Sequence, residues 1–136
     1  MSDIKQATHH RVLIVDDEES TRLLLARIVT IDVDAEVMLA GTCEQALRLG
    51  GNFAYDAVLL DLMMPGIGGF GVLKELRANS PNASTPIIIV SMLSEPAMVE
   101  RCMAAGASAY VVKPVERNSL ASTVKAQIAS RSRPRT

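Results

Sequence analysis

The amino-acid sequence predicts an α/β fold, with one five-stranded parallel sheet covered by helices on both faces. Five short apolar runs alternate along the chain with five segments whose apolar residues recur at helical spacing. Strands that alternate with helices form right-handed βαβ units, in which the helices cover the sheet. The 136 residues suffice for one domain with a core. We therefore expect one domain folded over residues 11–131, between a flexible segment at 1–10 and a basic tail or linker start at 132–136.

The composition is typical of a soluble globular protein. Hydrophobic residues make up 49% and charged residues 21%, which excludes a mainly disordered chain. No apolar run approaches the roughly 18 residues of a membrane span, so we expect a cytoplasmic protein with no membrane partner. Five basic residues and no acidic one follow Glu116, but without aromatic interleaving we expect no direct DNA binding. Cys43 and Cys102 lack metal-site spacing and should be free thiols.

The first two strands and helices are predicted from residues 12–51. The run Val12–Val15 is rich in β-branched residues and reads as a buried strand. The following helix should bury the apolar residues Leu24, Leu25, Ile28 and Ile31. A second strand is predicted at Glu36–Ala40. Thr42 and Gln45 form a capping-box pattern, and we expect the helix that they open to end at Gly50-Gly51.

Three more strands are predicted in the second half of the chain. Ala57–Leu60 is apolar throughout and should be buried on both faces of the sheet. The helix after it should bury Phe70, Leu73 and Leu76. Ile87–Val90 is the fourth strand, and the next helix should be capped by Ser94 and ended by Gly106. Ala109–Val112 is the fifth strand. The last helix should bury Leu120, Val124 and Ile128.

Polar side chains follow four of these strands where each strand ends. They are Asp16 and Asp17, Asp61, Ser91, and Lys113. In a parallel sheet the carboxyl ends of the strands share one edge, where ligands bind. Carboxylates a few ångströms apart repel by roughly 4 kcal/mol per pair at an effective dielectric constant near 20, so a cation is needed. Oxygen ligands favour Mg²⁺. A carboxylate beside Mg²⁺, a lysine and a hydroxyl can attack phosphorus and become an acyl phosphate.

Together these motifs resemble the response-regulator receiver domain of two-component signalling, in its single-domain, chemotaxis-regulator-like form. The matching residues are Asp16-Asp17, the turn Asp61–Gly66, Ser91, Tyr110 and Lys113-Pro114. The resemblance covers about residues 11–131. It implies a flavodoxin-like strand order of 2-1-3-4-5 and a signalling function rather than an enzyme with its own substrate. It also implies that the Lys113-Pro114 peptide bond is cis.

The resemblance assigns a role to each residue of the acidic site. Asp61 would be the phosphoacceptor, supplied by a sensor histidine kinase or a histidine phosphotransfer protein. Asp17 and Asp61 would bind Mg²⁺ directly, Asp16 would act mostly through water, and the backbone carbonyl of Met63 would complete the protein ligands.

Three further residues would carry the signal from Asp61 to a partner. Ser91 and Lys113 would contact the phosphoryl group, and Tyr110 would be the aromatic switch residue. A phosphoryl group stabilises any conformation that brings Ser91 and Lys113 closer to it. The fourth and fifth strands and the helices after them would respond, so residues 95–131 are the expected output surface. A single helix face cannot bury all four apolar residues Met98, Val99, Cys102 and Met103. We therefore expect an unknown downstream protein target, or a homodimer, at this surface.

Two positions that flank the expected phosphoryl group, Met63 and Leu93, are apolar where some family members carry polar side chains. Neither side chain can orient an attacking water. We hypothesise that the acyl phosphate hydrolyses slowly.

The same residues allow several alternative functions. Gly66–Gly71 matches the GxGxxG pattern of dinucleotide-binding enzymes, but the neighbouring carboxylates oppose a pyrophosphate, and turn glycines explain the pattern better. A flavin carrier would share the fold but not the acidic edge. A phosphatase with an aspartate nucleophile usually has a second acid where this chain has Met63. An unphosphorylated receiver-like interaction module is the remaining alternative.

Overall fold

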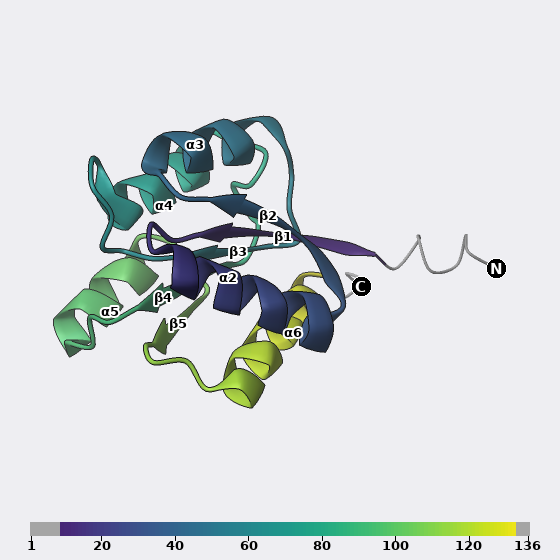
Figure 1. Cartoon of the computed structure of the whole chain (residues 1–136). Helices are drawn as coiled ribbons and strands as arrows, with labels where there is room; N and C mark the ends of the chain where they lie inside the picture. Colours follow the sequence, from purple (N-terminus) through teal and green to yellow (C-terminus); the bar gives the residue numbers. More distant parts are fainter. Residues whose placement is uncertain (1–8, 133–136) are drawn as a thin grey trace.

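The computed structural model describes residues 9–132, and within this range the chain forms one five-stranded parallel sheet between layers of helices (Figure 1). The spatial order of the strands is β2-β1-β3-β4-β5, which confirms the predicted order. The strands are β1 (His10–Val15), β2 (Ala35–Ala40), β3 (Ala57–Leu60), β4 (Ile87–Ser91) and β5 (Ala109–Val112). All four pairings are parallel, so the carboxyl ends of the strands meet at one edge.

Helices connect the strands and cover both faces of the sheet. They are α2 (Glu19–Ile28), the π-helical turn η1 (Val29–Val33), α3 (Cys43–Asn52), α4 (Gly68–Ala78), α5 (Pro96–Ala104) and α6 (Arg117–Ser132). Figure 1 shows α3 and α4 above the strands, and α2 and α6 on the opposite side. No helix within residues 9–132 is long and apolar enough to cross a bilayer.

The alternation of side chains along the central strands divides the core into two halves. Leu13 and Val15 of β1 pack with α3, α4 and α5, whereas Val12 and Ile14 pack with α2, η1 and α6. β3 and β4 alternate in the same way. Every residue of β3 is buried, as the unbroken apolar run at Ala57–Leu60 predicted. The strand that precedes Asp61 is therefore held from both faces.

The expected buried stripe of α2 is partly wrong. Leu25 and Ile28 are buried, but the side chains of Leu24 and Ile31 are 48% and 57% exposed, and Val29 is buried instead. For Ile31 the cause is the π-helical turn after Ile28, whose wider turn rotates later residues away from a regular helical spacing. Leu24 precedes that turn and is exposed within the regular part of α2. Asp34, with a φ of 59°, then ends the turn in the left-handed region.

The predicted stripes of the other helices agree better with the structure. Leu73 and Leu76 of α4 are buried, but Phe70 is only half-buried, and Val72 is buried in its place. Leu120, Val124 and Ile128 of α6 are buried, as predicted. Cys43 and Cys102 are free thiols and both are buried.

The prediction that α3 ends at Gly50-Gly51 is wrong, because the helix continues through both glycines to Asn52. Gly50 is buried against α4, where a Cβ atom would lie 2.7 Å from Leu76 Cδ2. This glycine therefore permits close helix packing rather than a helix end. The start of α3 is as predicted, since Thr42 Oγ1 accepts a hydrogen bond from the Gln45 backbone N–H at 3.0 Å.

The start of α5 also differs from the prediction. Ser94 does not cap the helix; the cap position is Glu95, without a side-chain hydrogen bond, and Pro96 is the first helical residue. Proline suits this position because its missing N–H would have had no helical partner. The end of α5 is as predicted, with Gly106 at a φ of 111°.

Within the described residues, regular structure extends from His10 at the start of β1 to Ser132 in α6. The predicted flexible segment and basic tail otherwise lie outside the described residues.

Candidate functional site

Three aspartates from two strand ends meet at the carboxyl edge of the sheet. Asp16 and Asp17 follow β1, and Asp61 follows β3, which is hydrogen-bonded to β1. Each aspartate offers a carboxylate oxygen within 4.8 Å of the others. Asp16 and Asp61 are buried and Asp17 is exposed. At this separation each pair of ionised carboxylates repels by roughly 3 to 4 kcal/mol at an effective dielectric constant near 20.

Lys113 brings a positive charge into this acidic cluster from the loop after β5. Its Nζ lies 2.8 Å from Asp16 Oδ2 and 3.6 Å from Asp61 Oδ2. Burial alone would lower the pKa of Lys113, but the hydrogen bond to Asp16 and the charges of Asp61 and Asp16 outweigh it and raise that pKa above its ordinary value. Lys113 therefore stays protonated at neutral pH. The peptide bond from Lys113 to Pro114 is cis, as the resemblance implied.

Each polar group of Asp16 has a partner. Its Oδ2 accepts from Lys113, and its Oδ1 accepts from the Glu18 backbone N–H at 2.9 Å. Its backbone N–H donates to Ala40 O at 3.1 Å, and its carbonyl oxygen accepts from Arg22 Nη1 at 2.8 Å. Asp16 is therefore fixed within the site.

Asp61 is held at the start of a tight turn. Its Oδ1 accepts a hydrogen bond from the Met63 backbone N–H at 3.3 Å. Burial raises the pKa of Asp61, the charge of Lys113 and the Met63 N–H oppose that shift, and the charges of Asp16 and Asp17 add to it. The folded protein therefore disfavours the ionised form of this carboxylate more than water does.

The turn after Asp61 depends on glycine. Gly66 and Gly68 have φ values of 91° and 77°, in the left-handed region that favours glycine. Gly69 lies in the first turn of α4 against the Asp61 backbone, where a Cβ atom would lie 1.9 Å from the Asp61 carbonyl oxygen. The positive φ values explain the first two glycines of the GxGxxG pattern, Gly66 and Gly68, as turn geometry.

Ser91 and Tyr110 lie near the site but do not line its acidic pocket. Ser91 is fully buried, and its Oγ accepts a hydrogen bond from the Leu93 backbone N–H at 3.2 Å. The Tyr110 hydroxyl donates to the Leu93 carbonyl oxygen at 2.6 Å. Burial is the main cause of a raised pKa of Tyr110. Ser91 and Tyr110 are therefore joined through Leu93, in the loop between β4 and α5.

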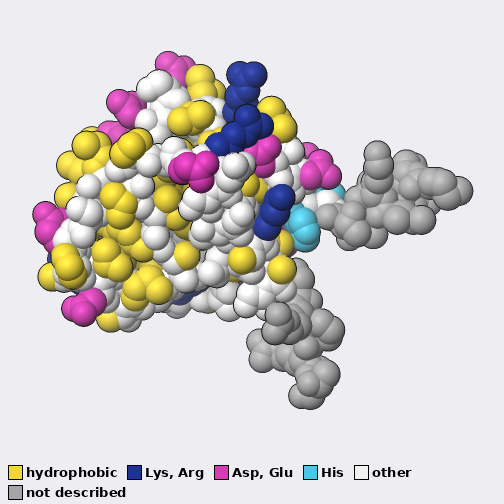
Figure 2. All heavy atoms as spheres, turned by 90° about the horizontal axis from the view of Figure 1, so that it is seen from below, with side chains coloured by type: hydrophobic (Ala, Val, Ile, Leu, Met, Phe, Trp, Pro, Cys, Tyr) yellow, Lys and Arg dark blue, Asp and Glu magenta, His cyan; other side chains and the backbone are white. Residues whose placement is uncertain are grey.

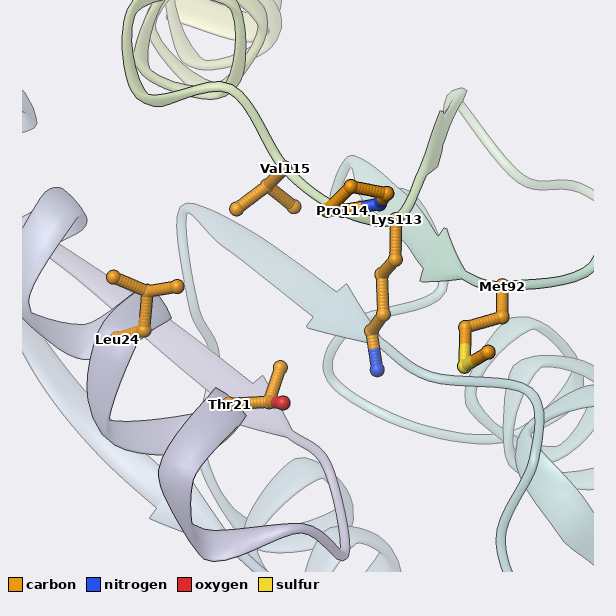
Figure 3. A pocket seen from close by; sticks show the side chains of 6 residues that line it. All are labelled: Thr21, Leu24, Met92, Lys113, Pro114 and Val115. Carbon is orange, nitrogen blue, oxygen red and sulfur yellow. The ribbon is translucent and has the colours of Figure 1, made fainter.

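Two neighbouring cavities open at this edge. The acidic pocket has a volume of about 440 Å³ and is lined by Asp16, Asp17, Glu18, Asp61, Met63, Met92 and Lys113. A second, largely apolar cavity of about 310 Å³ is lined by Thr21, Leu24, Met92, Lys113, Pro114 and Val115 (Figure 3). Figure 3 shows the Lys113 side chain extending between Thr21 and Met92. Lys113 and Met92 thus belong to the walls of both cavities.

The donor set fits a divalent cation. Three carboxylates and one ammonium group carry a formal charge of −2 when all are ionised, and a divalent cation would balance it. The oxygen atoms are the type that Mg²⁺ prefers, and the open pocket leaves room for water and phosphate oxygens.

Sequence reasoning missed Arg22, Thr21 and Met92. Arg22 contacts the backbone of Asp16, and Thr21 and Met92 line the apolar cavity. One signal was available for Arg22, because a cation near the start of a helix opposes the helix dipole and therefore suggests another purpose. No comparable signal distinguishes Thr21 or Met92.

The comparisons with known proteins agree with this geometry. The sequence matches the family model for the response regulator receiver domain over residues 12–125. The match covers most of the chain, and the chain therefore belongs to the response regulator receiver domain family.

Curated relatives place the same region in longer proteins. The chain is 34% identical over 116 residues to the sensory/regulatory protein RpfC of Xanthomonas campestris, covering 84% of this chain and 16% of that protein. It is 37% identical over 124 residues to the probable transcriptional regulator ycf27 of Guillardia theta, covering 91% of this chain and 47% of that protein. The chain thus spans less than half the length of these two relatives.

Solved structures show the same fold. The chemotaxis protein CheY4 of Vibrio cholerae is 28% identical with a TM-score of 0.81, and the match covers 88% of this chain and 99% of that chain. The receiver domain of the sensor histidine kinase PA1611 from Pseudomonas aeruginosa is 25% identical with a TM-score of 0.81, covering 90% and 99%. That receiver structure has a magnesium ion coordinated in its active site cleft.

The family determines the class of function. The chain is a phosphoacceptor receiver domain of two-component or phosphorelay signalling. Receiver domains of these systems interact with histidine kinases. The family match does not favour an aspartate phosphatase or an unphosphorylated interaction module.

Proposed function

We propose that Asp61 accepts a phosphoryl group from a phosphohistidine of a sensor histidine kinase or a phosphotransfer protein. One observation carries this proposal. Asp61 is the buried aspartate at the end of the central strand β3, with Lys113 Nζ 3.6 Å from its Oδ2 and a backbone N–H on its Oδ1. In the transfer, a bond forms between an Asp61 carboxylate oxygen and phosphorus while the bond from phosphorus to the donor imidazole nitrogen breaks. The electron pair of that bond stays on the imidazole.

The residues around Asp61 prepare this step. Lys113 reaches Asp61 from the loop after β5, and its positive charge attracts the negative oxygens of the transferring group. Asp17 and Asp61 would bind Mg²⁺ directly, Asp16 mostly through water, and the Met63 backbone carbonyl would be a further ligand. When bound, Mg²⁺ supplies positive charge to the phosphoryl oxygens. Because Asp17 is exposed, the phosphohistidine donor can approach the pocket from this side.

The signal would leave the site through the fourth and fifth strands. An acyl phosphate adds close to two negative charges and new acceptor oxygens beside Asp61. The Ser91 hydroxyl and the Lys113 ammonium group can donate to these oxygens. Ser91 is linked through Leu93 to the Tyr110 hydroxyl, so a shift of this loop moves Tyr110, the proposed switch residue.

The output surface would be formed by residues 95–131. Figure 2 shows hydrophobic side chains gathered on the side of the molecule where α5 lies, with acidic side chains beside them. Met103 of α5 is exposed and Cys102 is buried, so the prediction that α5 cannot bury all its apolar residues agrees with the structure. A downstream protein, or a second copy of the chain, would cover this surface.

Phosphorylation by a small acyl phosphate tests the proposal directly. Acetyl phosphate with Mg²⁺ should add one phosphoryl group per chain, measured by mass spectrometry, and Asp61→Asn should add none. Asp34→Asn is the matched control, because Asp34 is an exposed aspartate that adopts the left-handed conformation which asparagine tolerates. Phosphorylation of Asp61→Asn at the wild-type level would refute Asp61 as the acceptor. Repeated hydrolysis of phosphate esters by the wild type would favour a phosphatase instead.

A further inference from the structure

Arg22 joins α2 to the ends of β1 and β2 beside the acidic pocket. Its Nη1 donates a hydrogen bond to the Asp16 carbonyl oxygen at 2.8 Å. The same guanidinium group lies against Gly41, which follows β2, because a Cβ atom at Gly41 would be 3.0 Å from Arg22 Nη1 and 3.4 Å from its Cζ. The absence of a side chain at Gly41 therefore leaves the space that the guanidinium group occupies.

The Asp16 carbonyl oxygen belongs to the peptide plane that leads into Asp17. A peptide unit is rigid, so fixing its carbonyl oxygen fixes the direction in which the next residue starts. Within residues 9–132, the Asp17 side chain makes no hydrogen bond or ion pair with another residue, in contrast to Asp16. The orientation of the Asp17 carboxylate therefore depends on the backbone that carries it, and Arg22 holds that backbone.

We propose that Arg22 is a positioning residue that directs the Asp17 carboxylate into the acidic pocket, and that Gly41 provides the space for it. This inference rests on the proposed function, in which Asp17 binds Mg²⁺. Residues that orient metal ligands without touching the metal commonly change metal affinity about 10- to 100-fold when they are mutated.

A purely electrostatic role for Arg22 would have the opposite sign. A positive charge close to a metal site repels an incoming cation, so its removal alone should strengthen Mg²⁺ binding. Removal of a positioning contact should weaken Mg²⁺ binding. The direction of the change therefore separates the two roles.

The test is a calorimetric titration of the unphosphorylated, metal-free protein with Mg²⁺. We expect Arg22→Ala to weaken Mg²⁺ binding about tenfold. Arg22→Lys keeps the charge but loses the planar guanidinium group, and it should restore only part of the affinity. Arg27→Ala removes the same charge from an exposed position on the same helix and should leave the affinity unchanged.

A double-mutant cycle with Gly41→Ala tests the contact itself. Alone, Gly41→Ala should displace the guanidinium group and weaken Mg²⁺ binding severalfold. Combined with Arg22→Ala, it should cause no further loss, because the group that it displaces is gone. Circular dichroism of each metal-free variant checks that the fold is intact.

Unchanged or stronger Mg²⁺ binding in Arg22→Ala would overturn the inference. If that variant does not fold, unchanged Mg²⁺ binding in Gly41→Ala and Arg22→Lys would overturn it equally. Failure of the proposed function would look different: the wild type itself would neither bind Mg²⁺ nor accept a phosphoryl group from acetyl phosphate.

Discussion

Asp61 shows at the scale of one residue how the chemistry of the site opposes the stability of the fold. Its carboxylate is buried beside two other aspartates, and Lys113 balances only part of that charge. Burial is the largest cause of its raised pKa. An ionised carboxylate at this position is reactive because it is poorly solvated, and it costs stability for the same reason.

We predict that Asp61→Asn stabilises the metal-free protein while it abolishes phosphorylation. Asparagine keeps an oxygen for the Met63 N–H and removes a buried charge. The cost of burying that charge is the largest cause of the raised pKa of Asp61, and with the repulsion from Asp16 and Asp17 it outweighs the attraction to Lys113. We expect a gain of about 1–2 kcal/mol in the free energy of unfolding. Urea denaturation with a chelator present measures it. Added Mg²⁺ should stabilise the wild type more than the variant, and a less stable metal-free variant would contradict the prediction.

Gly69 is the residue where backbone packing leaves no space for a side chain. A Cβ atom there would lie 1.9 Å from Asp61 O and 2.7 Å from Leu62 Cα, and both are backbone atoms that cannot turn aside. The start of α4 is therefore fitted against the backbone of the phosphoacceptor.

We predict that Gly69→Ala lowers the free energy of unfolding by more than about 3 kcal/mol or displaces the turn after Asp61. Gly51→Ala is the matched control, because nothing lies within 4 Å of its Cβ position and it is exposed in α3. The control should stabilise the protein by roughly 0.5 kcal/mol, through the better helix propensity of alanine. Urea denaturation of both variants checks the contrast. Equal effects of the two substitutions would show that close packing at Gly69 does not matter.

The side chain of Met63 should affect how long the phosphorylated state lasts. Its side chain is 54% exposed and lines the acidic pocket, where an attacking water would enter. We predict that Met63→Asn shortens the lifetime of the acyl phosphate, because the amide can orient a water molecule and the thioether cannot. The decay of phosphorylated protein over time measures this. An unchanged lifetime would count against the hypothesis of slow self-dephosphorylation.

At the scale of elements, one exposed ion pair ties α6 to the π-helical turn η1. Arg117 donates to Asp32 through Nε at 2.6 Å and through Nη2 at 2.9 Å. The hydrogen bond from Arg117 is the largest cause that lowers the pKa of Asp32. A lowered pKa in the folded state means that the ionised form stabilises the fold.

We predict that Asp32→Asn destabilises the protein at pH 7 and that the difference fades in acid. The stabilisation is complete above the pKa of an aspartate in the unfolded chain, about 3.9, and is lost as the pH falls through the lower folded value. Urea denaturation between pH 7 and pH 3 should show this trend, weakened by salt because the pair is exposed. Asp34→Asn, two residues away, is the control. A difference between Asp32→Asn and the wild type that is as large at pH 3 as at pH 7 would exclude the ion pair as its cause.

The sequence predicted every strand and the acidic cluster because these depend on continuous apolar runs and on the residues that follow them. Ala57–Leu60 could only be a buried strand, and the shared edge of a parallel sheet then determined where Asp61 lies. Features that depend on contacts between elements could not be predicted. Three features of this kind are the π-helical turn after α2, the passage of α3 through Gly50, and the hydrogen bond from Arg22 to the Asp16 backbone. Each depends on how segments pack against one another.

At the scale of the whole molecule, the conformational change that follows phosphorylation should remain in the part of the sheet formed by β4 and β5. Ser91 belongs to β4, Tyr110 to β5 and Lys113 to the loop after β5, whereas β2, α3 and η1 carry none of the proposed switch residues. We predict that phosphorylation changes the backbone amide chemical shifts most in residues 87–116 and least in β2 and α3, outside the acidic pocket itself. Two-dimensional NMR spectra before and after acetyl phosphate and Mg²⁺ measure this. Equal changes across the chain would contradict a directional switch.

α5 is the element that such a signal could move most easily. Of its nine described residues, only Cys102 is buried, and a cation–π contact between Arg101 and Phe70 of α4, with the guanidinium carbon 4.3 Å from the ring centroid, is a second anchor. Met98 packs against the core only in part. A helix with few fully buried side chains samples other positions at a low energetic cost. Chemical modification of one carboxylate, some distance away, can then select among those positions without disturbing the rest of the core.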